Sequence, residues 1–372
     1  MIKSSRGCCG AEELAEVKEA FEYGYFGLAY KTNEFEQKMA DYLDTDRFVI
    51  TTSTGTNALH LAMDTIGIKP GDEVIMPSMT FVATAQAVQM CGGTPVFCEI
   101  HPDTFLMDVE DVKRKITSKT KAIIPVHYAG RPCDMDALIK IKEETGIRIV
   151  EDAAHAFGTY YKGKKIGSFG DITCFSFDSI KVMTCGEGGA VVTNDEAFDD
   201  LSRKKRLLGI DRKTMVTKDW KKRSWVYDVP TLGYRYHMSN INAAIGLAQL
   251  KKVDKFIERR RELCHLYDEQ LKDVQGIKLM PDSYDTITPF MYVIRVEDGK
   301  RNALKDFLME HDIESGISYI PCHNFTLFAN EGESLPITEK AYEELLCIPM
   351  HYELTNEDIV EVSNRIKEFL AQ

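Results

Sequence analysis

The sequence contains few of the features that indicate disulfides, metal centres or membrane segments. Its ten cysteines include no pair at C-x-x-C spacing, so we expect reduced thiols and no metal site. No apolar run approaches the roughly 18 to 20 residues of a membrane span. The first residues, MIKSSRGCCGAEEL, lack the apolar stretch of a signal peptide. These absences predict a cytoplasmic protein that does not bind membranes.

Positive charge is also scarce, because 46 Lys and Arg stand against 58 Asp and Glu. The resulting net charge of -12 argues against a general affinity for nucleic acid. A composition of 44% hydrophobic and 28% charged residues excludes a disordered or low-complexity chain. A length of 372 residues predicts about two globular domains.

Two common phosphate-binding fingerprints are missing. Gly186, Gly188 and Gly189 do not form the G-x-G-x-x-G pattern of dinucleotide folds, and no G-x-x-x-x-G-K-[ST] loop is present. A nicotinamide-dependent oxidoreductase is therefore unsupported.

What the sequence does contain is a regular alternation of short apolar runs and helical stretches. Strands are predicted at 48–52, 73–77, 94–100, 121–128 and 146–152, with helical segments between them. This α/β pattern predicts a mostly parallel sheet covered by helices on both faces. In such sheets ligands bind at the carboxyl ends of the strands.

The pattern changes in the second half of the chain. A long helix is predicted from its N-cap Ser239 to about residue 271, joining two domains. Beyond it follow a strand-like run, further helices and a final amphipathic helix that begins at the N-cap Thr355. We therefore predict a large α/β domain over residues 1–250 and a smaller α+β domain over 251–372.

The segment from residue 150 to 192 carries the strongest chemical signals. Asp152 ends an apolar strand, where a buried charge is costly without a partner. A cationic ring nitrogen would be such a partner, although capping of a helix over residues 153–157 would explain the acid equally well. Lys181 follows in a stretch of low charge. Burial would lower its pKa and leave the neutral amine that a Schiff base requires, whereas a solvent-facing turn is the alternative.

A second candidate site is the segment TTSTGTNALHLAM. Gly55 and Thr56 fall between a strand and a helix, where free backbone N–H groups can bind a phosphate. The alternative is that this Ser- and Thr-rich segment only caps the N-terminus of the helix and binds no phosphate.

Several motifs occur in a specific order: STGTNAL, GDEVIMPSMTF, PVHYAG, EDAAHA, CFSFDSIKVMTCGEGG and GYRYHMSNINAAIGLAQL. Together they resemble the sugar aminotransferases of the DegT/DnrJ/EryC1/StrS family, fold type I enzymes that depend on pyridoxal 5'-phosphate (PLP). The resemblance extends from FEQKMA near residue 35 to LCIPMHYELT near the C-terminus. It implies the fold type I architecture and PLP as the cofactor.

The resemblance also implies roles for individual residues. Lys181 matches the lysine that binds PLP covalently and then moves the proton, and Asp152 matches the acid paired with the pyridine nitrogen. His155 stands where many members have Gln, near the ring oxygen of the cofactor. The other matching positions are Phe81, which would stack on the ring, and Gly55, Thr56 and Ser176, which would bind the phosphate.

Two further segments also resemble the family, and one of them departs from the usual family pattern. In GYRYHM, Arg235 replaces the Asn that reaches the PLP phosphate of the partner subunit, and His237 replaces an Arg. Arginine binds phosphate well, so a homodimer with shared sites is expected, although a surface arginine is the alternative. In ISYIPCHNF, Tyr319 and His323 are candidate substrate contacts, and a structural histidine is the alternative.

The implied reaction is ping-pong transfer of an amino group from L-glutamate to a nucleotide-linked ketosugar. We expect a 4-keto-6-deoxy sugar on dTDP, GDP or UDP, for surface polysaccharide or aminosugar biosynthesis. Alternatives are a 3-keto sugar, a PLP-dependent sugar dehydratase of the same fold, or a non-catalytic homologue. In the dehydratases histidine replaces the lysine, so Lys181 argues against that reaction.

Overall fold

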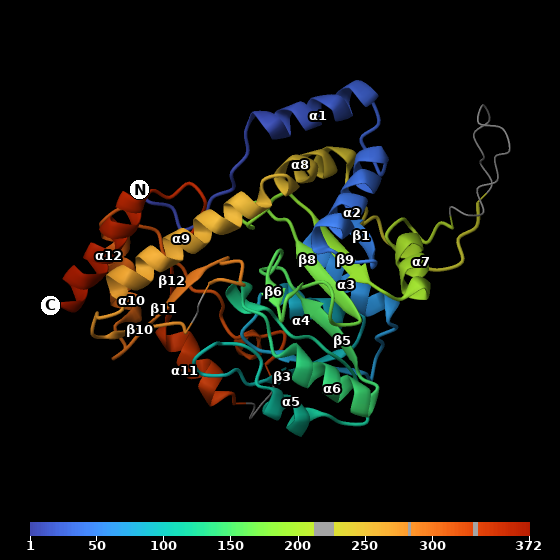
Figure 1. Cartoon of the computed structure of the whole chain (residues 1–372). Helices are drawn as coiled ribbons and strands as arrows, with labels where there is room; N and C mark the ends of the chain where they lie inside the picture. The colour runs from blue at the N-terminus through green and yellow to red at the C-terminus, as the bar shows by residue number, and fades with distance from the viewer. Residues whose placement is uncertain (212–226, 282–283, 330–333) are drawn as a thin grey trace.

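The computed structural model describes residues 1–211, 227–281, 284–329 and 334–372. A seven-stranded sheet forms its centre, in the order β1-β9-β8-β5-β4-β2-β3 (Figure 1). β9 is antiparallel to both of its neighbours, and the other strand pairs are parallel. The predicted mostly parallel sheet is therefore confirmed. The strands are β1 (Phe48–Thr52), β2 (Glu73–Pro77), β3 (Thr94–Cys98), β4 (Thr120–Ile123), β5 (Arg148–Asp152), β8 (Ile172–Ser176) and β9 (Gly189–Thr193).

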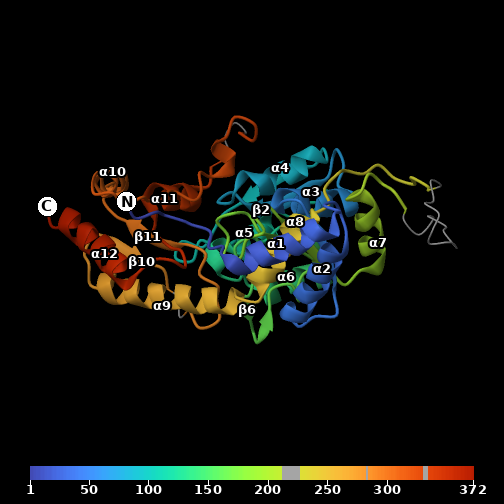
Figure 2. The same ribbon diagram turned by 90° about the horizontal axis from the view of Figure 1, so that it is seen from above.

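Helices cover both faces of this sheet (Figures 1 and 2). Along β2, Val74 and Met76 belong to the core beneath α3 and α4, whereas Ile75 belongs to the core beneath α5 and α6. Successive residues of a strand point to opposite faces, so one continuous apolar run supplies both cores. The helices of this part are α1 (Ala11–Tyr23), α2 (Tyr30–Leu43), α3 (Gly55–Thr65), α4 (Val82–Met90), α5 (Val109–Lys115), α6 (Met135–Thr145), α7 (Glu196–Lys205) and α8 (Asn240–Leu250). A short hairpin, β6 (Tyr160–Tyr161) and β7 (Lys164–Lys165), follows β5.

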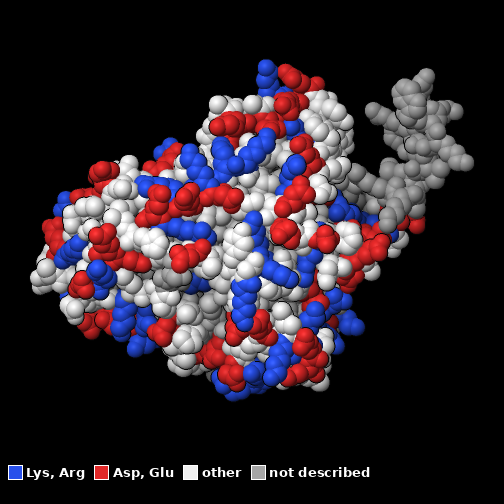
Figure 3. Space-filling view, viewed as in Figure 1, with Lys and Arg blue, Asp and Glu red and all other residues white. Residues whose placement is uncertain are grey.

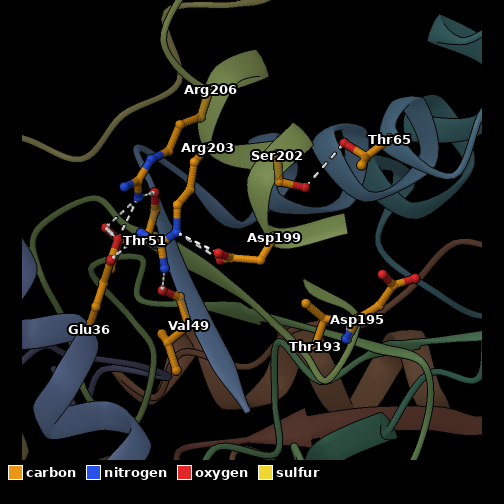
Figure 4. Close-up of polar contacts among 10 residues, drawn as sticks. All are labelled: Glu36, Val49, Thr51, Thr65, Thr193, Asp195, Asp199, Ser202, Arg203 and Arg206. Atoms are coloured by element: carbon orange, nitrogen blue, oxygen red, sulfur yellow. Dashed lines mark hydrogen bonds and ion pairs between the residues drawn. The ribbon is translucent and has the colours of Figure 1, made fainter. Parts of the chain in front are cut away.

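A buried ion-pair cluster joins α2 and α7 to β1 (Figure 4). The carboxylate of Glu36 accepts hydrogen bonds from Arg203 at 2.8 Å, from Arg206, and from both the backbone N–H and the hydroxyl of Thr51. Burial opposes ionisation of Glu36, but the two guanidinium groups lower its pKa below the ordinary value. Removing one member of such a cluster leaves a buried charge without its partner.

The C-terminal part has a small antiparallel sheet in the order β10-β11-β12. Residues between Leu263 and Ile366 form a separate apolar core around it. The predicted division at residue 250 stays a prediction. The elements are β10 (Ile277–Leu279), β11 (Tyr292–Val296), β12 (Leu345–Ile348), α9 (Val253–Leu271), α10 (Arg301–Glu310), α11 (Pro336–Glu344) and α12 (Asn356–Leu370), with a 3-10 turn at Cys322–Asn324. Another 3-10 turn, Tyr128–Gly130, lies between β4 and α6. The predicted N-cap of α12 is confirmed, because Thr355 accepts a hydrogen bond from the backbone N–H of Asp358.

The predicted long helix after Ser239 is wrong, because it consists of two helices, α8 and α9. Ser239 caps α8 as expected, but α8 ends at Leu250 and α9 begins at Val253. At the break, the N–H of Lys252 donates to the carbonyl of Gln249 at 2.9 Å, and its ammonium pairs with Glu13 of α1. The sequence has no Gly or Pro there, so tertiary contacts rather than a local signal mark the break.

Candidate active site

A cavity of about 510 Å³ lies at the carboxyl edge of the large sheet. The parallel directions of β1, β2, β5 and β8 bring the loops that follow these strands to the same edge. These loops form one side of the cavity. Segments next to β11 and β12, the segment 316–319 and the first residues of the chain complete it.

Asp152 is the last residue of β5 and is 5% exposed. Its carboxylate accepts hydrogen bonds from the Thr84 hydroxyl at 2.7 Å and from the Ala154 N–H at 3.2 Å. Burial raises the pKa of Asp152, although both hydrogen bonds oppose the shift. Residues 153–157 form turns rather than the helix considered for capping. The side chain instead lines the cavity.

Lys181 lies in the loop between β8 and β9 and lines the same cavity. Burial lowers its pKa to about 8, although the carboxylates of Asp152 and Asp178 favour the ammonium form. Its Nζ is 4.3 Å from the centre of the Phe290 ring. A solvent-facing turn lysine does not have these surroundings. The amine and the acid of Asp152 therefore belong to one electrostatically coupled site.

His155 follows Asp152 by three residues and is 6% exposed. Its Nε2 lies 3.0 Å from the hydroxyl of Tyr319, and its ring stacks on Phe290 with 4.3 Å between centres. Burial, followed by the charge of Lys181, keeps the pKa of His155 well below its ordinary value, so the imidazole is neutral near pH 7. Its buried Nδ1 has no hydrogen-bond partner among the described residues.

The first turn of α3 forms another wall. Thr54 caps the helix by accepting a hydrogen bond from the N–H of Asn57. The N–H groups of Gly55 and Thr56, in the first turn, have no acceptor within the helix. A Cβ atom added to Gly55 would lie 2.6 Å from Cβ of Ser176. Glycine therefore permits α3 to approach the end of β8 closely. These two N–H groups and the Ser176 side chain line the cavity together, as an anion site requires.

Phe81 precedes α4 and lines the cavity with a ring that is 54% exposed. The centre of this ring is 5.7 Å from that of Tyr319. A phenylalanine that only packed in the apolar core would be buried, so the exposure of Phe81 favours contact with a bound molecule.

Comparison with known proteins identifies the family. The model of the DegT/DnrJ/EryC1/StrS aminotransferase family matches residues 8–367. The chain belongs to this family. It is a PLP-dependent sugar aminotransferase, and its structure confirms the fold type I architecture expected from the motifs.

The aminotransferase is similar to named relatives over nearly its whole length. GDP-perosamine synthase from Escherichia coli O157:H7 is 38% identical over 339 residues, which are 91% of this chain and 90% of that protein. The aminotransferase TlmJ from Streptoalloteichus hindustanus superposes with a TM-score of 0.93 at 33% identity, covering 100% of this chain and 99% of that one. The PLP form of Spr1654 from Streptococcus pneumoniae, described as a sugar aminotransferase, has a TM-score of 0.90 at 30% identity, with 99% and 98% covered.

The residues of the cavity fit PLP. Lys181 supplies an amine of lowered pKa, Asp152 a buried acid, and His155 a buried nitrogen for which the described part of the chain offers no partner. A separate set of donors around Gly55 suits a phosphate. PLP contains an aldehyde, a basic ring nitrogen, a ring hydroxyl and a phosphate, so each of its polar groups has a chemically suitable partner.

Two predicted site residues lie elsewhere. Arg235 is exposed, forms a β-bridge with Leu207, and does not line the cavity of its own chain. His323 is buried outside the cavity, with Nδ1 2.7 Å from the Ser78 hydroxyl and Nε2 3.4 Å from a Glu339 oxygen. Tyr319, by contrast, lines the cavity as expected for a substrate contact. The roles of all three stay predictions.

Sequence reasoning missed several residues of the cavity. Thr84 is three positions beyond Phe81, so the same helix start could have suggested it. Three other lining residues lie far in sequence from every quoted motif: Phe290, Ser4 and Ser5. They reach the cavity only because tertiary packing brings their segments beside the loops of the large sheet. No local pattern marks them.

No group of three or more His, Cys, Asp or Glu side chains in the described ranges is arranged to hold a metal ion. None of the helices in those ranges is both long and apolar enough to cross a membrane. Figure 3 shows basic and acidic side chains interspersed over the visible face.

Proposed function

We propose that the aminotransferase transfers the amino group of L-glutamate to a keto carbon of a nucleotide-linked sugar. The acceptor is a 4-keto-6-deoxyhexose on dTDP, GDP or UDP, and the product serves surface polysaccharide or aminosugar biosynthesis. The observation that carries the proposal is the meeting of Lys181, Asp152 and the Gly55 anion site in one cavity. A relative named for a GDP-linked amino sugar, 38% identical, supports the nucleotide-sugar substrate.

PLP supplies an electron-accepting ring that stabilises negative charge on the carbon next to the amino group. The Asp152 carboxyl shares a proton with the ring nitrogen and so maintains that electron demand. The amine of Lys181, neutral in a useful fraction because its pKa is about 8, takes the proton from Cα of glutamate. The neutral imidazole of His155 would donate to the ring oxygen, and Phe81 would cover one face of the ring.

The small-domain side of the cavity suits a deoxy sugar. Met291, Cys347, Ile348 and Met350 all line it, and these side chains are apolar or only weakly polar. A sugar methyl group can contact them without leaving a hydroxyl unpaired, whereas a primary alcohol at the same carbon would lose hydrogen bonds with water. This lining favours a 6-deoxyhexose over a sugar with a 6-hydroxyl.

The site is completed by a second copy of the chain. Arg235 lies outside its own cavity and is exposed, so its guanidinium is available to the phosphate of the partner subunit's cofactor. Arg235→Ala is expected to weaken PLP retention about tenfold, measured by cofactor release on dilution. Unchanged retention would contradict this role. Arg261→Ala, on α9, is a control for the loss of an arginine.

The proposed function is tested by following its two half-reactions, with glutamate and with the ketosugar, separately. Purified protein should show the visible absorption of lysine-bound PLP, lose it on borohydride reduction, and change its spectrum when glutamate is added. The glutamate-treated protein is then mixed with a panel of dTDP-, GDP- and UDP-linked ketosugars, and the amino sugar formed is detected by mass spectrometry. Colour that no amino donor changes would favour the dehydratase or the inactive homologue instead. Amination of a 3-keto rather than a 4-keto sugar would correct the position alone.

A further inference from the structure

The first residues of the chain form an extended segment beside the cavity, here called the N-terminal strap (residues 2–9). At one end it joins the small sheet region: the N–H of Ile2 donates to the carbonyl of Asp312 at 2.7 Å, and Ile2 accepts from the N–H of Glu314 at 2.9 Å. The carbonyl of Ser4 accepts from the N–H of Met350 at 3.0 Å. Figures 1 and 2 both show the N-terminus beside the C-terminal elements.

The other end of the strap is held by the large part of the molecule. The carbonyl of Cys8 accepts from the side-chain amide of Gln249 at 2.7 Å. A Cβ atom added to Gly7 would lie 2.5 Å from the carbonyl oxygen of Ser179, two residues before Lys181. The strap therefore connects the segments that follow α10 and β12 to the loop that carries Lys181, and it is held at both ends.

Ser4 and Ser5 lie between these anchors, and both line the cavity. Each is half-buried, and neither hydroxyl has a hydrogen-bond partner among the described residues. A serine hydroxyl both donates and accepts, so it matches the hydroxyl groups of a sugar. Glutamate presents two carboxylates instead, which favour cationic partners.

We infer that Ser4 and Ser5 bind hydroxyl groups of the ketosugar and thereby contribute to the choice of sugar. The inference rests on the proposed function. It assigns a substrate-recognition role to the N-terminal strap, which contains none of the motifs that identify the family. Because hydrogen bonds at both ends hold the backbone of the strap, the two serines meet the sugar without a large cost in ordering the chain.

The test compares the two half-reactions in Ser4→Ala, Ser5→Ala and the double variant, using the PLP-loaded protein and the ketosugar that the panel identifies. We expect the double variant to lower kcat/KM for the ketosugar about tenfold, mainly through a higher KM. The rate of the glutamate half-reaction, followed by absorbance, should stay within about twofold. Arg6→Lys is the matched control, because Arg6 lies on the strap, is 63% exposed and does not line the cavity, and a lysine can keep its ion pair with Glu353. Its kinetics should match the unaltered protein.

Three outcomes decide the inference, provided that PLP content and melting temperature of the variants are unchanged. An unaltered kcat/KM for the ketosugar in the double variant overturns it. An equal loss in both half-reactions also overturns it, since the serines would then act on the donor or on the shape of the site. If the unaltered protein responds to glutamate but aminates no ketosugar, the proposed function itself fails, and the inference with it.

Discussion

The lowered pKa of Lys181 makes the cavity testable without any substrate. Burial shifts its pKa from 10.5 to about 8. At pH 7 roughly one such amine in ten is neutral, compared with roughly one in 3,000 for an unperturbed lysine, a difference of about 300-fold. Because only the neutral amine attacks an electrophile, Lys181 of the cofactor-free protein should react far faster than surface lysines of similar access.

The assay is labelling of the cofactor-free protein with a small amine-specific reagent over a range of pH, with peptide mass analysis. Reaction at Lys181 should rise as the pH increases through about 8, because the amine loses its proton there. Lys140, whose side chain is 74% exposed, serves as an internal reference for reagent activity.

A substitution gives the sign of the electrostatic coupling. The Asp152 carboxylate favours the ammonium form of Lys181, so Asp152→Asn should move the labelling midpoint to lower pH. Asp103→Asn removes an exposed carboxylate elsewhere and should leave the midpoint unchanged. A midpoint above pH 10 in the unaltered protein, or an upward shift in Asp152→Asn, would refute this account of the site.

Two further substitutions test the anion site and the scaffold. Gly55→Ala places a Cβ atom 2.6 Å from that of Ser176 and should weaken PLP binding at least about tenfold in a cofactor titration; unchanged affinity would show that the close approach is dispensable. Glu36→Gln leaves the buried guanidinium of Arg206 without its counter-charge, whereas Arg203 keeps its ion pair with Asp199. The substitution should lower the free energy of unfolding by about 3 kcal/mol in denaturant melts. The pKa of Glu36 is lowered by folding, so this difference should be complete near neutral pH and shrink as the pH falls below about 4.5; a difference that does not depend on pH would contradict the ion-pair explanation.

The amino-acid sequence alone determined the architecture and predicted two residues, Asp152 and Lys181, that line the cavity. Short apolar runs closed by turn residues identify strands such as β1 and β5, because the period of burial is local. The same local chemistry fixes the N-caps Ser239 and Thr355. For Asp152 and Lys181 the local signals left helix capping and a solvent-facing turn open as alternatives, and the resemblance of the ordered motifs to the family indicated their roles.

Only the tertiary structure decided how these groups are surrounded. The contact between His155 and Tyr319 joins residues 164 positions apart, and that between Thr84 and Asp152 joins residues 68 positions apart. The break between α8 and α9 depends on the pairing of Lys252 with α1. The presence of Ser4 beside the cavity likewise depends on its hydrogen bond with Met350. Such contacts leave no periodic trace in the sequence, because each arises from packing between elements rather than from the preferences of neighbouring residues.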